Sequence, residues 1–128
     1  VSSREILKNL ADYLKYDFDI IIDDASHNLR DILITLPIFF KKLKKDGYYV
    51  IEDANQFKIY KELNPYNEVL TPLNILSKIK NDIKFHSKHL SSDDAKYLKK
   101  NIKTFVVKKG TSIVNGHNIS DIIFLRKK

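Results

Sequence analysis

Two pairs of adjacent acids and one histidine follow two of the most apolar segments of the chain. Asp23 and Asp24 end the run FDIIIDD, Glu52 and Asp53 end the run GYYVIED, and His27 follows Asp24 by three positions. If both runs are neighbouring parallel strands, their backbones lie about 4.8 Å apart and the acids converge on one rim of the sheet. Carboxylates this close repel each other unless a cation or a proton lies between them. Such an all-oxygen site suits Mg²⁺, Mn²⁺ or Ca²⁺, and we expect Mg²⁺ first.

His27 is placed to act as a base beside this site. A hydroxyl bound to a metal ion is more acidic than a free one, so a metal ion and a nearby base together can produce an alkoxide nucleophile. A structural interpretation stays open, because Ser26 or Asp24 can cap the next helix and Glu52 and Asp53 can end a strand in solvent. Each acid pair alone favours the structural role, whereas both pairs on one rim with His27 favour a site.

The elements that must position these residues follow from the spacing of apolar side chains. Phe18 to Ile22 is short, β-branched and apolar on both faces, which is typical of a parallel strand covered on both sides, and Gly47 to Asp53 reads as a second buried strand. Between them Pro37 predicts a kink or a late start in a helix with a lysine-rich last turn. The apolar positions of this helix are Leu29, Ile32, Leu33, Leu36, Phe39, Phe40 and Leu43. Strand, helix and strand imply a right-handed parallel crossover and the α/β class.

Further elements flank this unit on both sides. Ser2 to Glu5 matches a capping box before an amphipathic helix, Thr71 and Pro72 match the first residues of another, and Ser91 begins a short helix that ends near Asn101. IKTFVVKK and SDIIFLRKK predict an antiparallel strand pair at one sheet edge. The stretch ANQFKIYKELNPYNEVL is a long irregular connection, which favours a lid or a substrate contact.

The length, composition and charge of the chain limit the classes of protein to which it can belong. With 128 residues, 43% of them hydrophobic, the chain is long enough for one domain with one core. The absence of cysteine excludes disulfide frameworks and thiolate catalysis. We expect a cytoplasmic protein, because no apolar run approaches the roughly 20 residues of a membrane span and the first residues do not resemble a signal peptide. The net charge of +7 comes from scattered lysines, so nucleic-acid binding is a weak third function.

The segment from Phe18 to Asn55, FDIIIDDASHNLRDILITLPIFFKKLKKDGYYVIEDAN, resembles the second half of class I methyltransferases that use S-adenosylmethionine. In particular, it looks like the metal-dependent sugar O-methyltransferases of macrolide biosynthesis, the macrocin and mycinamicin type. Their pattern is a strand ending Asp-Gly-Ser-His, a helix, a Gly-Gly turn and a strand ending Tyr-Val-Ile-Glu-Asp. Here Asp24 to His27 reads DASH, Asp46 and Gly47 stand at the turn, and Tyr49 to Asp53 reads YVIED.

This resemblance implies a partial Rossmann-like methyltransferase fold, in which parallel strands have helices on both faces and an antiparallel strand pair follows at the C-terminal end. It implies Asp24, Glu52 and Asp53 as ligands of Mg²⁺ or Mn²⁺. It also implies His27 as the general base that deprotonates a sugar or glycoside hydroxyl for methyl transfer. S-adenosylmethionine is then the methyl donor of the complete enzyme.

The chain departs from the family pattern in its glycines. Family members hold the cofactor with a Gly-rich loop upstream of this motif, whereas the chain has three isolated glycines, Gly47, Gly110 and Gly116. We therefore expect the cofactor-binding half to be absent from the chain. The chain is then either a piece of a longer enzyme or a reduced, non-catalytic relative. Residues 1–128 then form a single domain that is inactive by itself. The strand from Phe18 to Asp23 becomes an apolar edge, through which we expect self-association.

Overall fold

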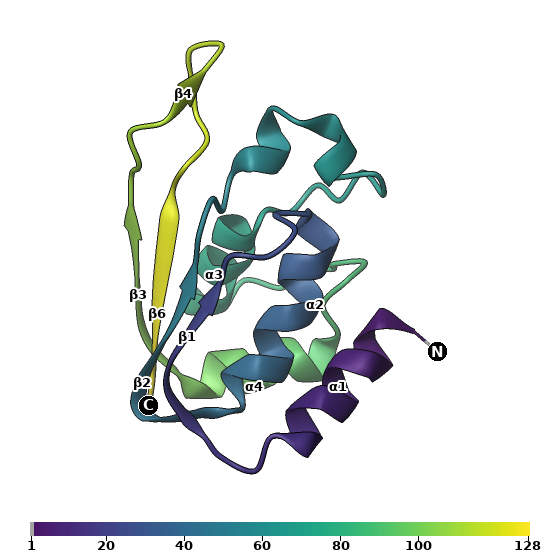
Figure 1. Cartoon of the computed structure of the whole chain (residues 1–128), viewed down its shortest axis with the longest axis vertical. Helices are drawn as coiled ribbons and strands as arrows, with labels where there is room; N and C mark the ends of the chain where they lie inside the picture. Colours follow the sequence, from purple (N-terminus) through teal and green to yellow (C-terminus); the bar gives the residue numbers. More distant parts are fainter. Residues whose placement is uncertain (1) are drawn as a thin grey trace.

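A four-stranded mixed sheet with the order β1-β2-β6-β3 organises the computed structural model, which describes residues 2–128 (Figure 1). The strands are β1 (Phe18–Asp23), β2 (Leu43–Ile51), β3 (Ile102–Lys108) and β6 (Ile122–Lys127). β1 and β2 are parallel, whereas β6 runs antiparallel to both β2 and β3. The predicted parallel neighbours and the predicted antiparallel pair at the end of the chain are therefore confirmed.

The helices begin where local capping groups place them. They are α1 (Ser3–Tyr13), α2 (Leu29–Phe40), α3 (Pro72–Lys80) and α4 (Ser92–Asn101). The Ser2 hydroxyl accepts from the backbone N–H of the third helical residue of α1, and Ser91 does the same for α4. Thr71 and Asn74 form a reciprocal capping box at the start of α3. The helix starts expected from these serine and threonine residues are confirmed.

The end of α2 differs from the sequence prediction. The helix continues through Pro37 but stops at Phe40, and Leu43 already pairs with Phe18 as the first residue of β2. The lysines expected in a last helical turn thus lie in an irregular first part of β2, where the register with β1 shifts. A Cβ on Gly47 would lie 2.9 Å from a backbone oxygen of β1, so a glycine is required at this close approach.

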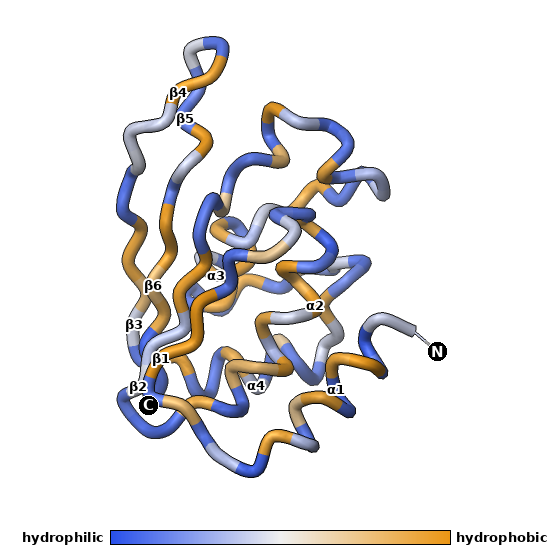
Figure 2. Tube along the Cα trace, in the orientation of Figure 1, coloured by the Kyte–Doolittle hydropathy of each residue, from blue (hydrophilic) through white to orange (hydrophobic). Residues whose placement is uncertain are grey.

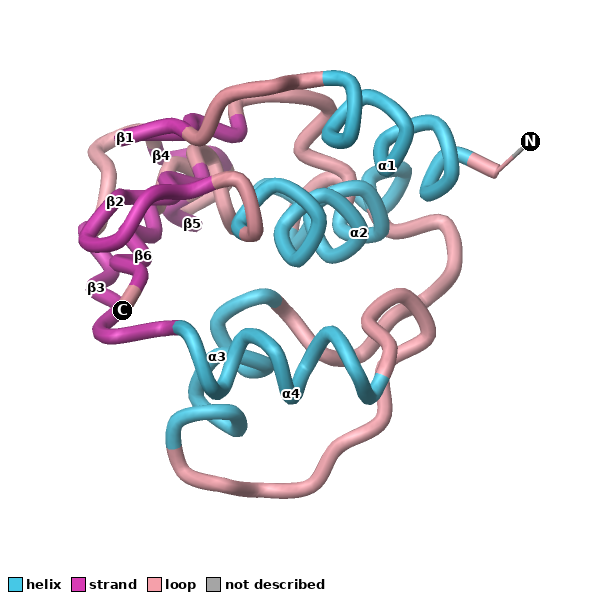
Figure 3. The backbone as a smooth tube through the Cα atoms, turned by 90° about the horizontal axis from the view of Figure 1, so that it is seen from below, coloured by secondary structure: helices cyan, strands magenta, loops and turns pink. Residues whose placement is uncertain are grey.

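Helices cover only one face of the sheet in residues 2–128, which corrects the expectation of helices on both faces (Figure 3). On the opposite face, Ile20 and Ile22 are 60% and 59% exposed and Val106 is 48% exposed. The apolar character of β1 on both sides was recognised in the sequence, but all four α-helices pack on the same side. β1 is also an edge strand of the sheet, as expected.

The hydrophobic core lies between the covered sheet face and the helices. Figure 2 shows that apolar residues are concentrated in the central strands and along α2. α2 is buried on most sides because it packs against α1, α3, α4 and both parallel strands. Its fully buried side chains include Leu29, Leu33, Leu36 and Phe40, and they meet Tyr49 and Ile51 of β2 in the same cluster. This packing holds the carboxyl ends of β1 and β2 in place.

A small hairpin, β4 (Ile113–Val114) and β5 (His117–Asn118), projects beyond the sheet between β3 and β6 (Figure 1). Asn115 and Gly116 at its tip have positive φ angles of 49° and 76°, as an Asn-Gly hairpin turn requires. Its base is tied to the segment after β2, because the buried Asn55 side chain donates to the Asn118 carbonyl. No helix in residues 2–128 has both the length and the apolar character needed to cross a bilayer.

Candidate metal centre

The acids expected to converge follow two hydrogen-bonded parallel strands. Asp23 pairs with Ile51 in register, and the backbone N–H of Glu52 donates to the Asp23 carbonyl at 3.0 Å. The residues that follow, Asp24 and Asp53, therefore leave the sheet at the same rim. The carboxyl end of a parallel sheet is where open α/β folds place their ligands.

Asp24, His27 and Asp53 form one cluster at this rim. One ligand atom from each of the three lies within 4.8 Å of the others. The His27 Nε2 atom is 3.7 Å from an Asp24 carboxylate oxygen and 3.8 Å from an Asp53 carboxylate oxygen. The Gln56 side chain donates to the Asp53 carboxylate at 2.8 Å and helps to orient it. Two carboxylates thus face a single imidazole, which is the only basic side chain within ion-pair distance of Asp24 and Asp53 in residues 2–128.

Two members of the cluster have an unusual backbone conformation. His27 and Asp53 have φ angles of 53° and 47°, in the left-handed region that side-chain-bearing residues rarely adopt. Each such residue costs on the order of 1 kcal/mol and persists only where surrounding structure enforces it. This backbone turns the chain sharply after β1 and β2, and such strained residues are concentrated at functional sites.

Glu52 is not brought into the cluster. It is half-buried, and the cluster within 4.8 Å consists of Asp24, His27 and Asp53. The chain leaves the extended conformation after Ile51, where β2 ends, and the positive φ of Asp53 turns it toward His27 while Glu52 stays outside. The roles of Asp24, Glu52 and Asp53 as metal ligands and of His27 as base remain predictions.

The structural alternative was that Ser26 or Asp24 caps the helix that follows, but another residue caps it. Asn28 is the N-cap of α2, where its side chain accepts from the Arg30 backbone N–H at 3.0 Å. The Ser26 hydroxyl donates to Asp31 at 2.7 Å and accepts from the backbone N–H of Asn28. Asp24 is therefore not engaged as the cap, and its side chain is 59% exposed at the rim.

A partly buried polar pair, Asp23 and Tyr49, lines the same cavity as Asp24, and sequence reasoning did not assign the pair a role. The Tyr49 hydroxyl donates to an Asp23 carboxylate oxygen at 3.0 Å. Burial raises the pKa of Asp23, against the lowering effect of the Tyr49 hydrogen bond. Burial and the nearby Asp23 charge raise the pKa of Tyr49 well above its usual value. Tyr49 is fully buried in the core. Asp23 and Tyr49 line a cavity of about 310 Å³ beside the edge strand, together with Phe39 of α2.

The long connection after β2 folds back toward the start of α2. It contains two short 3₁₀ helices, η1 (Gln56–Lys58) and η2 (Lys61–Leu63). Tyr66 packs edge-on against His89 with ring centroids 5.4 Å apart, and the Arg30 guanidinium lies 5.5 Å from the Tyr66 ring centre. Because Arg30 follows His27 by three positions, the connection approaches the helix end that carries the cluster. The role of this connection as a lid or a substrate contact remains a prediction.

Comparison with known proteins gives no sequence-level match, since no protein-family model and no curated protein matches the chain. Solved structures do match. The MycE methyltransferase of the mycinamycin biosynthetic pathway, in complex with Mg, SAH and mycinamycin VI, aligns with a TM-score of 0.65 and 24% identity over 98% of this chain. Two further MycE structures with Mg and SAH give TM-scores of 0.62 and 0.61 at 22% and 21% identity.

The chain spans 29% of the length of MycE in the first of these matches. At this level of identity the comparison establishes the fold, and it agrees with the fold class expected from the motif between Phe18 and Asn55. The chain therefore has a methyltransferase-like α/β fold, and it resembles the C-terminal half of a class I S-adenosylmethionine-dependent methyltransferase of the MycE type.

Proposed function

We propose that the chain is the C-terminal part of an Mg²⁺-dependent O-methyltransferase that uses S-adenosylmethionine and acts on a sugar or glycoside hydroxyl. The observation that carries this proposal is the cluster of Asp24, His27 and Asp53 at the carboxyl ends of two adjacent parallel strands. The fold supports it, because the similar MycE structures contain Mg and SAH, and one of them contains mycinamycin VI.

The residues present fit a divalent metal ion. Asp24 and Asp53 supply two carboxylates whose oxygens come within 4.8 Å of one another, and such oxygens are the ligands that Mg²⁺ and Mn²⁺ prefer. Glu52 follows the same strand and would complete the oxygen set if its side chain turned toward them. A metal ion bound there would make a coordinated hydroxyl more acidic.

His27 is the residue that would accept the proton of the acceptor hydroxyl. Its side chain is 21% exposed, so the imidazole is held in place yet can be reached from the rim. The carboxylates of Asp24 and Asp53 lie at similar distances from its Nε2 atom, 3.7 and 3.8 Å. The S-adenosylmethionine site would be formed mainly by parts of a complete methyltransferase domain that these residues do not include.

The proposal is tested by Mn²⁺ binding, measured by electron paramagnetic resonance with Mg²⁺ as competitor. We expect saturable Mn²⁺ binding that Mg²⁺ displaces and that Asp24→Asn or Asp53→Asn weakens by about tenfold or more, because each loses one charged ligand. Glu52→Gln weakens binding only if its carboxylate joins the site.

Asp19→Asn is the matched control for this experiment. Asp19 lies on the same strand β1, is 80% exposed and pairs with Lys44 away from the cluster. The control variant should bind Mn²⁺ like the unchanged chain. Equal loss of binding in Asp19→Asn and Asp24→Asn, or no binding by a chain shown to be folded, would contradict a metal centre formed by these residues.

A second function, self-association without catalysis, is favoured by the open edge and face of the sheet. β1 is an edge strand, and Ile20 and Ile22 on it are more than half exposed. An apolar edge strand is a template for pairing with another chain. We expect light scattering to show mass rising with concentration and Ile22→Lys to keep the chain monomeric. A monomer at all concentrations would refute this function while leaving the metal centre untouched.

A further inference from the structure

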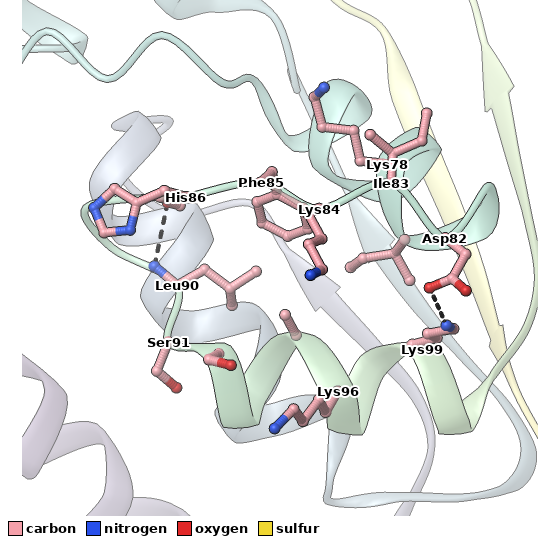
Figure 4. A pocket seen from close by; sticks show the side chains of 14 residues that line it. Lys78, Asp82, Ile83, Lys84, Phe85, His86, Leu90, Ser91, Lys96 and Lys99 are labelled. Atoms are coloured by element: carbon pink, nitrogen blue, oxygen red, sulfur yellow. Dashed lines mark hydrogen bonds and ion pairs between the residues drawn. The ribbon is translucent and has the colours of Figure 1, made fainter.

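A second cavity lies between α3, α4 and the loop that joins them, and it shares no lining residue with the metal centre (Figure 4). Its volume is about 490 Å³. Small-molecule sites in proteins typically have volumes of about 300 to 1,000 Å³ and combine apolar walls with a few polar groups. This cavity is large enough for a compact organic ligand.

The wall that the loop forms is held at both ends. After α3, the backbone N–H of Ile83 donates to the Lys78 carbonyl at 2.9 Å. Before α4, the Ser87 hydroxyl and the Lys88 backbone N–H both donate to the carboxylate of Glu68, which is buried. These bonds fix the loop on each side of the cavity. The site is therefore largely formed before a ligand binds, and binding loses little free energy to the ordering of the loop.

The inner surface of the cavity is apolar. Ile79 of α3 and Leu90 of the loop are 8% and 5% exposed and belong to the main core. Phe85 and Ala95 pack against the same core and line the cavity beside them. In Figure 4 the Phe85 ring points from the loop toward α4. An apolar body of about ring size would be buried against these side chains, with a gain of roughly 25 cal/mol for each Å² removed from water.

Positive charge surrounds this apolar interior. Lys84 points from the loop toward α4, which carries Lys96 and Lys99 (Figure 4). Lys99 forms an ion pair with Asp82, the sole acid in the lining. Within residues 2–128 neither Lys84 nor Lys96 has an acidic partner at ion-pair distance. Both side chains are exposed at the rim of the cavity, where they and the basic net charge of the chain would attract an anion.

We propose that this cavity binds a small organic anion, in which a phosphate, sulfonate or carboxylate group is attached to a ring-sized apolar body. The apolar body occupies the space beside Phe85, Ile79 and Leu90, and the anionic group lies between Lys84 and Lys96. The site is independent of the proposed methyl transfer, because it is formed by α3, α4 and their connection.

The test is isothermal titration calorimetry of the full chain with naphthyl phosphate, with naphthol and inorganic phosphate as partial probes. We expect naphthyl phosphate to bind about tenfold more tightly than either partial probe, a difference of roughly 1.4 kcal/mol. The double variant Lys84→Glu, Lys96→Glu should weaken binding of naphthyl phosphate by about tenfold or more. Ala95→Phe, which fills the cavity without changing charge, should weaken it as well.

The matched control is Lys108→Glu, Lys109→Glu, which changes the net charge equally at two exposed lysines beyond the cavity. This control should bind naphthyl phosphate within about twofold of the unchanged chain. Equal weakening in both double variants would overturn the proposal, because binding would then follow net charge alone. Equal affinity for inorganic phosphate would overturn the role of the apolar wall, and thermal unfolding of every variant establishes that it is folded.

Discussion

Replacement of Asp94 by asparagine tests whether one buried carboxylate holds three helices together. Asp94, in the first turn of α4, is 5% exposed. It accepts a hydrogen bond from the Arg4 guanidinium of α1 and one at 3.3 Å from Lys41, which caps the end of α2. Asp94→Asn preserves size but removes the negative charge that both cations face.

The expected loss of stability in Asp94→Asn depends on how deeply Asp94 and its two cationic partners are buried. Removing one partner of a fully buried ion pair costs about 3 to 5 kcal/mol. The Arg4 and Lys41 side chains are 30% and 47% exposed, so water screens their charges and rehydrates them once Asp94 is neutral. We therefore expect the free energy of unfolding to fall by about 1 to 3 kcal/mol, between the buried and the surface limits.

The pH dependence of this loss has a definite sign. Burial alone would raise the pKa of Asp94, but hydrogen bonds from Arg4 and Ser91 and the Arg4 and Lys41 charges outweigh it and lower the pKa below 3.8. A carboxyl with a lower pKa in the folded chain contributes stability above its unfolded pKa and loses it as pH falls through its folded pKa. The difference between the unchanged chain and Asp94→Asn should thus be complete at pH 7 and shrink below pH 4.

The assay is urea unfolding followed by far-ultraviolet circular dichroism at neutral and acidic pH. Asp93→Asn is the matched control, because Asp93 is the preceding, exposed acid in the same helical turn. It should lose only the fraction of a kcal/mol that an acid contributes at a helix N-terminus, about 0.3 to 1. The reasoning would be refuted by equal losses in the two variants, or by an Asp94→Asn loss that stays constant as the pH falls.

Two further predictions concern residues that position the strand ends. Gly47→Ala should lower the free energy of unfolding by about 1 to 3 kcal/mol, because the new Cβ would lie 2.9 Å from the backbone oxygens of Asp19 and Lys44. Urea unfolding measures this loss of stability, and an unchanged unfolding midpoint would contradict the close approach. Asn55→Ala removes a buried amide that accepts from the Asp121 backbone N–H, so amide hydrogen exchange in the β4–β5 hairpin should accelerate while exchange in α2 stays the same.

Several features could be predicted from sequence because their determinants are local. Thr71 and Ser91 mark the starts of α3 and α4, since a capping side chain bonds to backbone only a few residues away. The apolar run before Asp23 and Asp24 predicted a strand, and its parallel pairing with β2 followed from the intervening helix. Placing Asp24 and Asp53 on one rim required nothing beyond this connection.

The prediction of the end of α2 was wrong because local periodicity competes with strand pairing. Leu43 continues the helical spacing of the apolar residues, yet it pairs with Phe18 in the sheet instead. The spacing alone carries no information on that partner, which lies earlier in the chain. Similarly, the apolar pattern of β1 predicted a strand covered on both sides, whereas the packing leaves Ile20 and Ile22 exposed on a face that no helix covers in residues 2–128.

The sequence by itself determined the element types, the α/β class and the rim where acids and histidine gather. The tertiary structure decided which side chains meet: it joined His27 to Asp24 and Asp53 through positive-φ backbone and left Glu52 outside the cluster. It also brought Arg4 to Asp94, which are far apart in the chain. The physical reason is that capping and periodicity act over a few neighbouring residues, whereas contacts between distant residues depend on how the whole core packs.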